Sequence, residues 1–120
     1  MMMSKMLGLV AVAGAAAMLA ATGAQAHAKL VSSNPAANAT VAAPKAIVLK
    51  FDEKLQAKFS GANLAMPGMA TAAKVSVGKD GKTMMVQPKT PLMAGAYTVK
   101  WHAVTADTHR SQGTYTFTVR

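Results

Sequence analysis

Regular alternation of apolar and other residues is the feature that most limits the fold of this chain. In AYTVKWHAV (96–104), Tyr97, Val99, Trp101 and Ala103 fall on one face of an extended segment. Successive side chains on a strand point to opposite sides, so a period of two residues indicates a strand with one buried face. The segment therefore predicts a strand in a half-buried sheet.

Further segments fit the same interpretation, namely KAIVLKF (45–51), KVSV (74–77), KTMMVQ (82–87) and TYTFTV (114–119). The second and third of these flank GKDG (78–81), which is a hairpin signal. The stretch DEKLQAKFS (52–60) is long enough only for a helical turn. Several short strands separated by turn signals, with no convincing helix, predict an all-β sandwich or small barrel.

The first 26 residues have the composition of a secretory signal peptide. Lys5 supplies the positive charge, MLGLVAVAGAAAMLAATG (6–23) is an apolar run, and AQA (24–26) matches the small-x-small cleavage pattern. A membrane anchor is the alternative, but the run is mostly Ala and Gly and about the shortest that could span a bilayer. We therefore expect cleavage after residue 26, one exported domain over 27–120, and a bacterial periplasmic location.

Charge and cysteine content exclude several kinds of site. The chain has no cysteine, and 13 Lys and Arg residues face 4 Asp and Glu residues, which gives a net charge of +9. Disulfides, thiolate metal sites and cysteine nucleophiles are thereby excluded. The lysines are scattered singly and the aromatic residues have core parity, so the charge predicts a solubilising surface and no nucleic-acid site. The same charge can favour anionic membrane surfaces or an acidic partner.

Few side chains after the signal segment are suited to bind a metal. They comprise three histidines and four acids: His27, His102, His109, Asp52, Glu53, Asp80 and Asp107. In ADTHR (106–110), Asp107 and His109 are two residues apart, and in extended backbone both side chains would point the same way. A D-x-H pair alone is weak evidence, since Asp107 could simply cap a turn beside an exposed histidine.

Cleavage after Ala26 would turn His27 into the first residue of the exported chain. Its α-amine and its imidazole Nδ1 could then chelate one metal ion. The reference pKa of an α-amine, about 7.7–8.0, makes loss of that proton easy near neutral pH. Together with Asp107 and His109, the amine and imidazole would supply three nitrogens and one oxygen, a set that suits Cu(II).

The methionines and one acid are secondary candidates. Met66 and Met69 flank a Pro-Gly turn in LAMPGMATAAK (64–74), and thioethers prefer Cu(I), although methionine is also ordinary core filler. We expect Met93 in the core. Glu53 shares the parity of core residues at a strand end, so we expect it at the rim, either orienting a ligand or simply solvated.

Nearly the whole segment from His27 onward resembles the CopC/PcoC-type periplasmic copper-binding proteins. The matching stretches are HAKLVSSNPAANATVAAPKAIVLKFDEKL and LMAGAYTVKWHAVTADTHRSQGTYTFTV. The resemblance implies a Greek-key β-sandwich or barrel, cupredoxin- or immunoglobulin-like. It also implies that His27, Asp107 and His109 bind Cu(II), with an accessory contribution from Glu53.

The resemblance is incomplete at the methionines. Some members hold Cu(I) in a methionine-rich loop with a histidine. This chain has only MPGM there and no histidine between His27 and His102. We therefore expect the Cu(II) site alone, or that site together with a weakened Cu(I) site at Met66 and Met69.

The leading hypothesis is a monomeric copper carrier without catalysis, which sequesters Cu(II) or delivers it to an inner-membrane transporter of the CopD type. A copper-dependent monooxygenase is an alternative, because an amine- and imidazole-bound N-terminal histidine also forms the core of lytic polysaccharide monooxygenase sites. Asp107 would, however, block a position that oxygen needs. The third hypothesis is a metal-free immunoglobulin-like interaction domain. It predicts that copper does not stabilise the folded protein.

Overall fold

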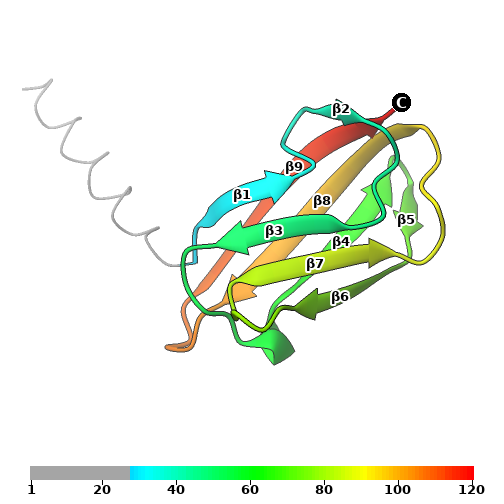
Figure 1. Ribbon diagram of the computed structural model, residues 1–120. Coiled ribbons are helices and arrows are strands. Elements are labelled where there is room, and N and C mark those ends of the chain that lie inside the picture. Colours follow the sequence, from blue (N-terminus) through cyan, green and yellow to red (C-terminus); the bar gives the residue numbers. More distant parts are fainter. Residues whose placement is uncertain (1–27) are drawn as a thin grey trace, which may run out of the picture.

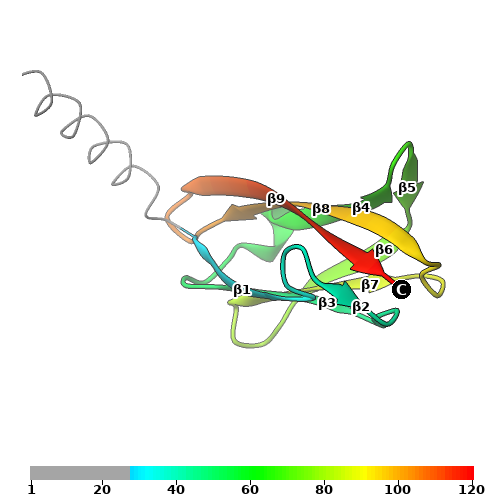
Figure 2. The same cartoon turned by 90° about the horizontal axis from the view of Figure 1, so that it is seen from above.

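Two β-sheets packed face to face make up the computed structural model, which describes residues 28–120 (Figures 1 and 2). One sheet has the order β1 (Leu30–Asn34), β3 (Ile47–Phe51), β7 (Thr83–Pro88), β6 (Ala73–Val77). The other has the order β2 (Thr40–Val41), β9 (Arg110–Val119), β8 (Gly95–Val104), β4 (Gly61–Met66), β5 (Met69–Thr71). The expected all-β sandwich is confirmed.

The strands with clear alternation are present, and β6 and β7 form the predicted hairpin. Four strands were not predicted, namely β1, β2, β4 and β5. Most of their residues are exposed or only half-buried, so hydrophobic pattern could not reveal them. The expected helical turn is a short 3-10 helix, η1 (Ala57–Phe59).

Strand β9 begins four residues earlier than the alternation predicted. Gly113 interrupts the pattern, but it lies opposite Trp101 in the β8–β9 register. A Cβ at Gly113 would lie 2.5 Å from the Trp101 ring, so the indole fills the space that a side chain would need. The glycine therefore allows β9 to pair with β8 over its full length.

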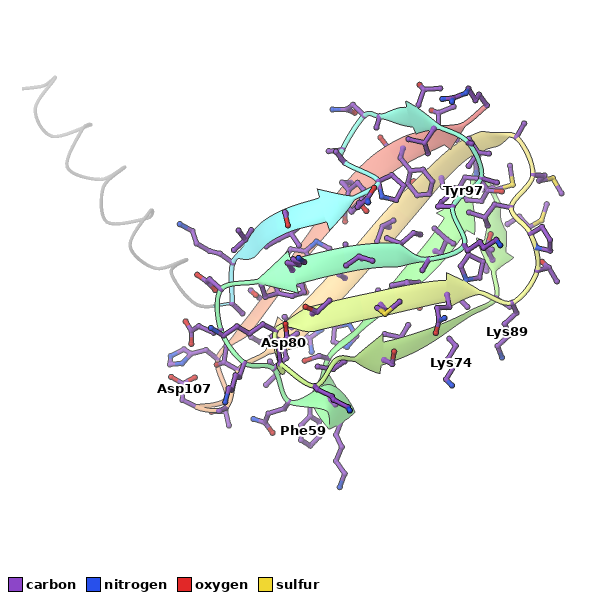
Figure 3. The ribbon with its side chains drawn as sticks, in the orientation of Figure 1. Phe59, Lys74, Asp80, Lys89, Tyr97 and Asp107 are labelled. Carbon is purple, nitrogen blue, oxygen red and sulfur yellow. The ribbon has the colours of Figure 1, made fainter. Side chains whose placement is uncertain are left out.

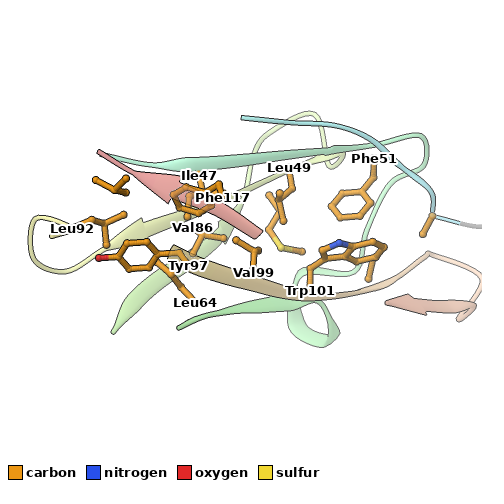
Figure 4. Packing of buried hydrophobic residues seen from close by; sticks show 14 residues of the cluster. Ile47, Leu49, Phe51, Leu64, Val86, Leu92, Tyr97, Val99, Trp101 and Phe117 are labelled. Atoms are coloured by element: carbon orange, nitrogen blue, oxygen red, sulfur yellow. The ribbon is translucent and has the colours of Figure 1, made fainter. Parts of the chain in front are cut away.

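The core lies between the sheets and contains the predicted inward residues (Figure 4). Tyr97 and Phe117 stack with their ring centroids 5.5 Å apart, and Phe51 meets the edge of Trp101 at 5.1 Å. The second pair closes the core near Ala28, which is fully buried. The first described residue is thus part of the core.

Strands β8 and β9 pair over ten residues, from Gly95–Val119 to Val104–Arg110, and connect the two ends of the sandwich. We call one end the histidine end: it contains the beginnings of β1 and β9 and the ends of β3 and β8. The methionine end contains the end of β4 and the beginnings of β5 and β8. Residues 28–120 include no helix that is long and apolar enough to cross a membrane.

Candidate metal site

The D-x-H motif lies in the loop between β8 and β9, at the histidine end (Figure 3). The two side chains meet, with His109 Nδ1 3.1 Å from Asp107 Oδ2. The expected reason for this proximity was wrong, because the backbone is not extended here. Thr108 has a φ of 70°, and its amide donates to the Thr105 carbonyl at 2.9 Å, so a tight turn brings the pair together.

Thr105 is the anchor of this turn, and it is buried. Its hydroxyl donates to Asp107 Oδ1 and accepts a hydrogen bond from the His109 amide at 3.2 Å. Gln56 Nε2 donates to the Thr105 carbonyl at 2.7 Å, which ties the turn to the segment after β3. The turn is thus fixed from inside while its two functional side chains remain more than half exposed.

The Asp107 carboxylate is held in its charged form. The hydrogen bond from Thr105, and next the contact with His109, lower the pKa of Asp107 to about 2. Both partners donate to or attract the anionic form, which is why the pKa falls. Near neutral pH the group is therefore an ionised oxygen donor at the surface.

The beginning of the described chain is fastened beside this turn. Ser111 Oγ donates to the Ala28 carbonyl at 2.9 Å, across 83 residues of sequence. The Lys29 amide donates to Asp52 Oδ1 at 2.8 Å, and the Asp52 amide donates to the Lys29 carbonyl at 3.1 Å. The segment at Ala28 is therefore fixed between the beginning of β9 and the end of β3.

Glu53 follows Asp52 directly and is half-buried at the same end. This is the position at the rim of the sandwich that the sequence predicted. His27 lies outside the described residues. Within residues 28–120, no three His, Asp or Glu side chains gather closely enough to hold a metal ion. Asp107 and His109 thus form a two-donor pair, and its predicted role as part of a copper site stays a prediction.

His102 lies elsewhere, on the outer face of β8, where it is half-exposed as expected. Its imidazole packs over Gly61 of β4, where an added Cβ would be 3.1 Å from His102 Cε1. Its strand position separates it from the D-x-H turn. The structure therefore does not bring it together with Asp107 and His109.

Met66 and Met69 are cross-strand partners at the methionine end, on either side of the expected Pro-Gly turn. Met66 is half-buried, and its terminal methyl packs on Gly95, where an added Cβ would be only 2.6 Å away. Met69 is 57% exposed. Met93 was expected in the core, but it is 63% exposed on the loop before β8, because Leu92 takes the buried position.

Sequence reasoning missed Thr105 and Ser111 as site residues, and it named Asp52 only as a possible metal-binding acid and not as the acceptor for the Lys29 amide. Thr105 carries a weak sequence signal, since it is the hydroxyl residue two positions before an Asp that begins a turn. Ser111 and Asp52 carry none, because their partners Ala28 and Lys29 are far away in sequence. Only the strand pairing reveals these contacts.

A two-sheet sandwich with a D-x-H turn beside its fastened N-terminal strand defines the class of protein: a small β-sandwich with a polar rim site. The family model for the CopC domain matches residues 30–120, and the chain belongs to this family. The family resemblance expected from the sequence is thereby confirmed.

Similar proteins cover most of the chain. Copper resistance protein C of Escherichia coli is 48% identical over 116 residues, covering 89% of this chain and 92% of the relative. Copper resistance protein C of Pseudomonas syringae pv. tomato is 52% identical over 114 residues, covering 88% and 90%.

Two solved structures share the fold. The crystal structure of PcoC, a methionine-rich copper resistance protein from Escherichia coli, is 50% identical with a TM-score of 0.73, covering 79% of this chain and 100% of PcoC. CopC from Methylosinus trichosporium OB3b is 28% identical with a TM-score of 0.72, covering 78% and 93%. The Greek-key sandwich expected from the resemblance agrees with these matches.

Proposed function

We propose that the chain is a periplasmic copper-binding protein of copper resistance, which holds Cu(II) at the histidine end through His27, Asp107 and His109. Removal of residues 1–26 would create the α-amine of His27. Glu53 would act as an accessory group at the rim. The protein would work as a monomer without catalysis, sequestering Cu(II) or passing it to a membrane transporter of the CopD type.

The hydrogen bond from Ser111 to the Ala28 carbonyl is the observation that carries this proposal. A residue bonded to Ala28 has its Cα about 3.8 Å away. His109 is two residues before Ser111, so their Cα atoms are at most about 7 Å apart. An N-terminal amine and imidazole attached to Ala28 are therefore within reach of the Asp107–His109 pair.

The chemistry of the donors supports Cu(II) in particular. Asp107 remains a carboxylate down to about pH 2, so it contributes charge and an oxygen at any physiological pH. Amine, imidazole and carboxylate donors favour Cu(II), which also binds most tightly among divalent first-row metals. Relatives named Copper resistance protein C, at about half identity, support the same assignment.

A comparison of two N-termini tests the proposal. Protein that begins at His27 is titrated with Cu(II), and binding is followed by EPR. The same titration is done with one glycine added before His27, which keeps every side chain but moves the α-amine out of the chelate. We expect the added glycine to lower the affinity by about a hundredfold and to change the nitrogen hyperfine pattern.

Equal affinity and equal spectra for the two proteins would contradict the amine chelate. A melting curve that does not move on adding Cu(II) would favour the metal-free interaction domain, because a specific ligand stabilises by about 2.7 kcal/mol at a hundredfold excess over Kd. The monooxygenase alternative predicts oxidation of a polysaccharide in the presence of a reductant. Our proposal predicts none.

We further propose that the methionine end is a weak Cu(I) site. Met66 and Met69 are directly paired, which allows both thioethers to contact one soft ion. Met93, on the loop two residues before Gly95, offers a third thioether at the same end. Titration with Cu(I) and a competing chelator should show weak binding that Met66→Leu with Met69→Leu abolishes, while unchanged binding would contradict this assignment.

A further inference from the structure

The outer face of the five-stranded sheet contains a polar hollow that the copper proposal does not use. Its volume is about 400 Å³, which is within the size range of small-molecule sites, about 300–1,000 Å³. Residues of β4, β8 and β9 line it: Asn63, Lys100, Trp101, His102, Arg110, Gln112, Gly113 and Thr114. The hollow is thus built on the three central strands of this sheet.

The strand register arranges the lining side chains in rows across the sheet. Asn63, Lys100 and Thr114 form one row, and Gly61, His102 and Gln112 form the next. Rows on one face of a sheet are about 7 Å apart. Arg110 belongs to the third row, next to that of His102 and Gln112. Gly61 has no side chain, and the His102 ring packs over it. The middle row therefore leaves space between the long side chains of Lys100 and Arg110 in the rows on either side.

The lining offers many donors and no negative charge. Lys100 and Arg110 are cations, Asn63 and Gln112 carry amide groups, and Thr114 carries a hydroxyl. Within residues 28–120, no ion pair or side-chain hydrogen bond engages Lys100, Arg110 or Gln112. Their donors are therefore available to a ligand.

Sugars and bases are poorly matched to this surface. Stacking needs an exposed aromatic face, whereas of the two aromatic lining residues Trp101 is only 9% exposed and His102 packs its ring over Gly61. Guanidinium and ammonium groups beside amides instead match a carboxylate or phosphate group, which an arginine can bind with two parallel hydrogen bonds.

We propose that this hollow binds a small multivalent oxyanion, either a phosphate or a polycarboxylate. Lys100 and Arg110 would contact it from the two flanking rows, and Gln112 would donate from the middle row. The inference does not rest on the proposed copper function. Arg110 follows the proposed ligand His109, but Lys100 and Gln112 lie on strands outside the D-x-H turn, and the test variants are placed at these two residues. Each proposal can therefore fail without the other.

The test is a titration of the copper-free, isotopically labelled protein with inorganic phosphate and, separately, with citrate, at constant pH and ionic strength. Amide NMR shifts are expected to move at 100, 112 and 114 and to saturate. Saturation by phosphate alone assigns a phosphoryl ligand, and saturation by citrate alone assigns a polycarboxylate. No saturable shift with either anion would overturn the proposal.

Three variants separate a built site from general attraction to a basic protein. Lys100→Gln should weaken binding by about five- to tenfold. Gln112→Leu, which leaves the charge unchanged, should weaken it by about threefold. Lys74→Gln is the matched control, because Lys74 is also an exposed lysine on a strand, β6 of the other sheet (Figure 3).

Equal losses of anion affinity for Lys100→Gln and Lys74→Gln would show that only the net charge of the protein attracts the anion. NMR shifts scattered over lysines on both sheets would show the same. Either result would contradict a defined site. Cu(II) titration of Lys100→Gln provides the second readout. Its copper affinity should equal that of the parent protein, so the anion result and the copper result are independently interpretable.

Discussion

The two ends of the sandwich are connected by the same strand, β8, but different forces hold them. At the histidine end, hydrogen bonds fix the geometry: Ser111 to Ala28, Lys29 to Asp52, and Thr105 to Asp107. At the methionine end, the Met66 thioether is held by packing on Gly95, while Tyr97 Oη donates a hydrogen bond at 2.8 Å to the carbonyl of Met93 on the neighbouring loop. Oxygen and nitrogen groups are concentrated at one end and thioethers at the other.

This difference matters for metal binding. Hydrogen-bonded donors have fixed positions, which suits an ion with a strict geometry, whereas methionine is flexible and adapts to its neighbours. Strand β8 has ten residues, so the ends are about 30 Å apart. A single copper ion therefore cannot contact both ends, and each end can be disabled separately.

Loss of one predicted ligand should have the largest effect. His109→Ala is expected to lower Cu(II) affinity by about a hundredfold or more, since even groups that only support a ligand contribute 10–100-fold. Cu(II) titration followed by EPR should also show one imidazole nitrogen fewer. The double variant Met66→Leu with Met69→Leu is the control, and a similar loss there would abolish the distinction between the two ends.

Packing at the methionine end can be broken at Gly95. This glycine has a φ of 143°, and an added Cβ would be 2.6 Å from the Met66 methyl, so Gly95→Ala strains the backbone and forces the flexible end of Met66 to move. We expect a loss of about 1–3 kcal/mol in the free energy of unfolding, measured by urea denaturation.

Gly78→Ala is the matched control for that experiment. A Cβ at Gly78 would make only ordinary contacts, the nearest at 3.6 Å. Its effect should be below about 0.5 kcal/mol. Equal losses at Gly78 and Gly95 would mean that neither the backbone conformation of Gly95 nor the packing of Met66 on it stabilises this end.

Loss of the hydrogen bond between Ser111 and Ala28 at the histidine end should lower the Cu(II) affinity less than loss of a ligand does. Ser111→Ala removes the hydrogen bond to the Ala28 carbonyl but no proposed ligand. We expect Cu(II) affinity to fall by about tenfold, because the N-terminal donors lose their fixed position. Ser111→Thr keeps the hydroxyl and should restore affinity, whereas a loss of stability with no change in the EPR titration would assign Ser111 a structural role only.

Prediction from the sequence succeeded where one short segment contains the whole signal. Alternation located β3, β7 and β8, and residue types located the D-x-H pair. It failed where the signal lies in partners distant in sequence: β1 is exposed on most of its residues, and Ser111 finds Ala28 across 83 positions. Met93 was misplaced because its hydrophobicity alone does not reveal that Leu92 occupies the buried position.

The smallest effect concerns the charge state of Asp107. Thr105→Val removes the hydroxyl that donates to this carboxylate, which is the largest cause of its low pKa. We expect the pKa of Asp107 to rise from about 2 toward 3.8, measured by NMR of its carboxyl carbon as a function of pH. Asp80 is an internal control, because Thr83 and Lys82 lower its pKa and neither is changed.

The direction in which pH changes the stability follows from the difference between the folded and unfolded pKa of Asp107. Since folding lowers the pKa of Asp107, its contribution to stability is present above 3.8 and is lost as the pH falls from 3.8 through about 2. In Thr105→Val that loss should occur closer to 3.8. If the pKa of Asp107 does not change, the low value comes from His109 instead, and the buried threonine does not set the charge of the histidine end.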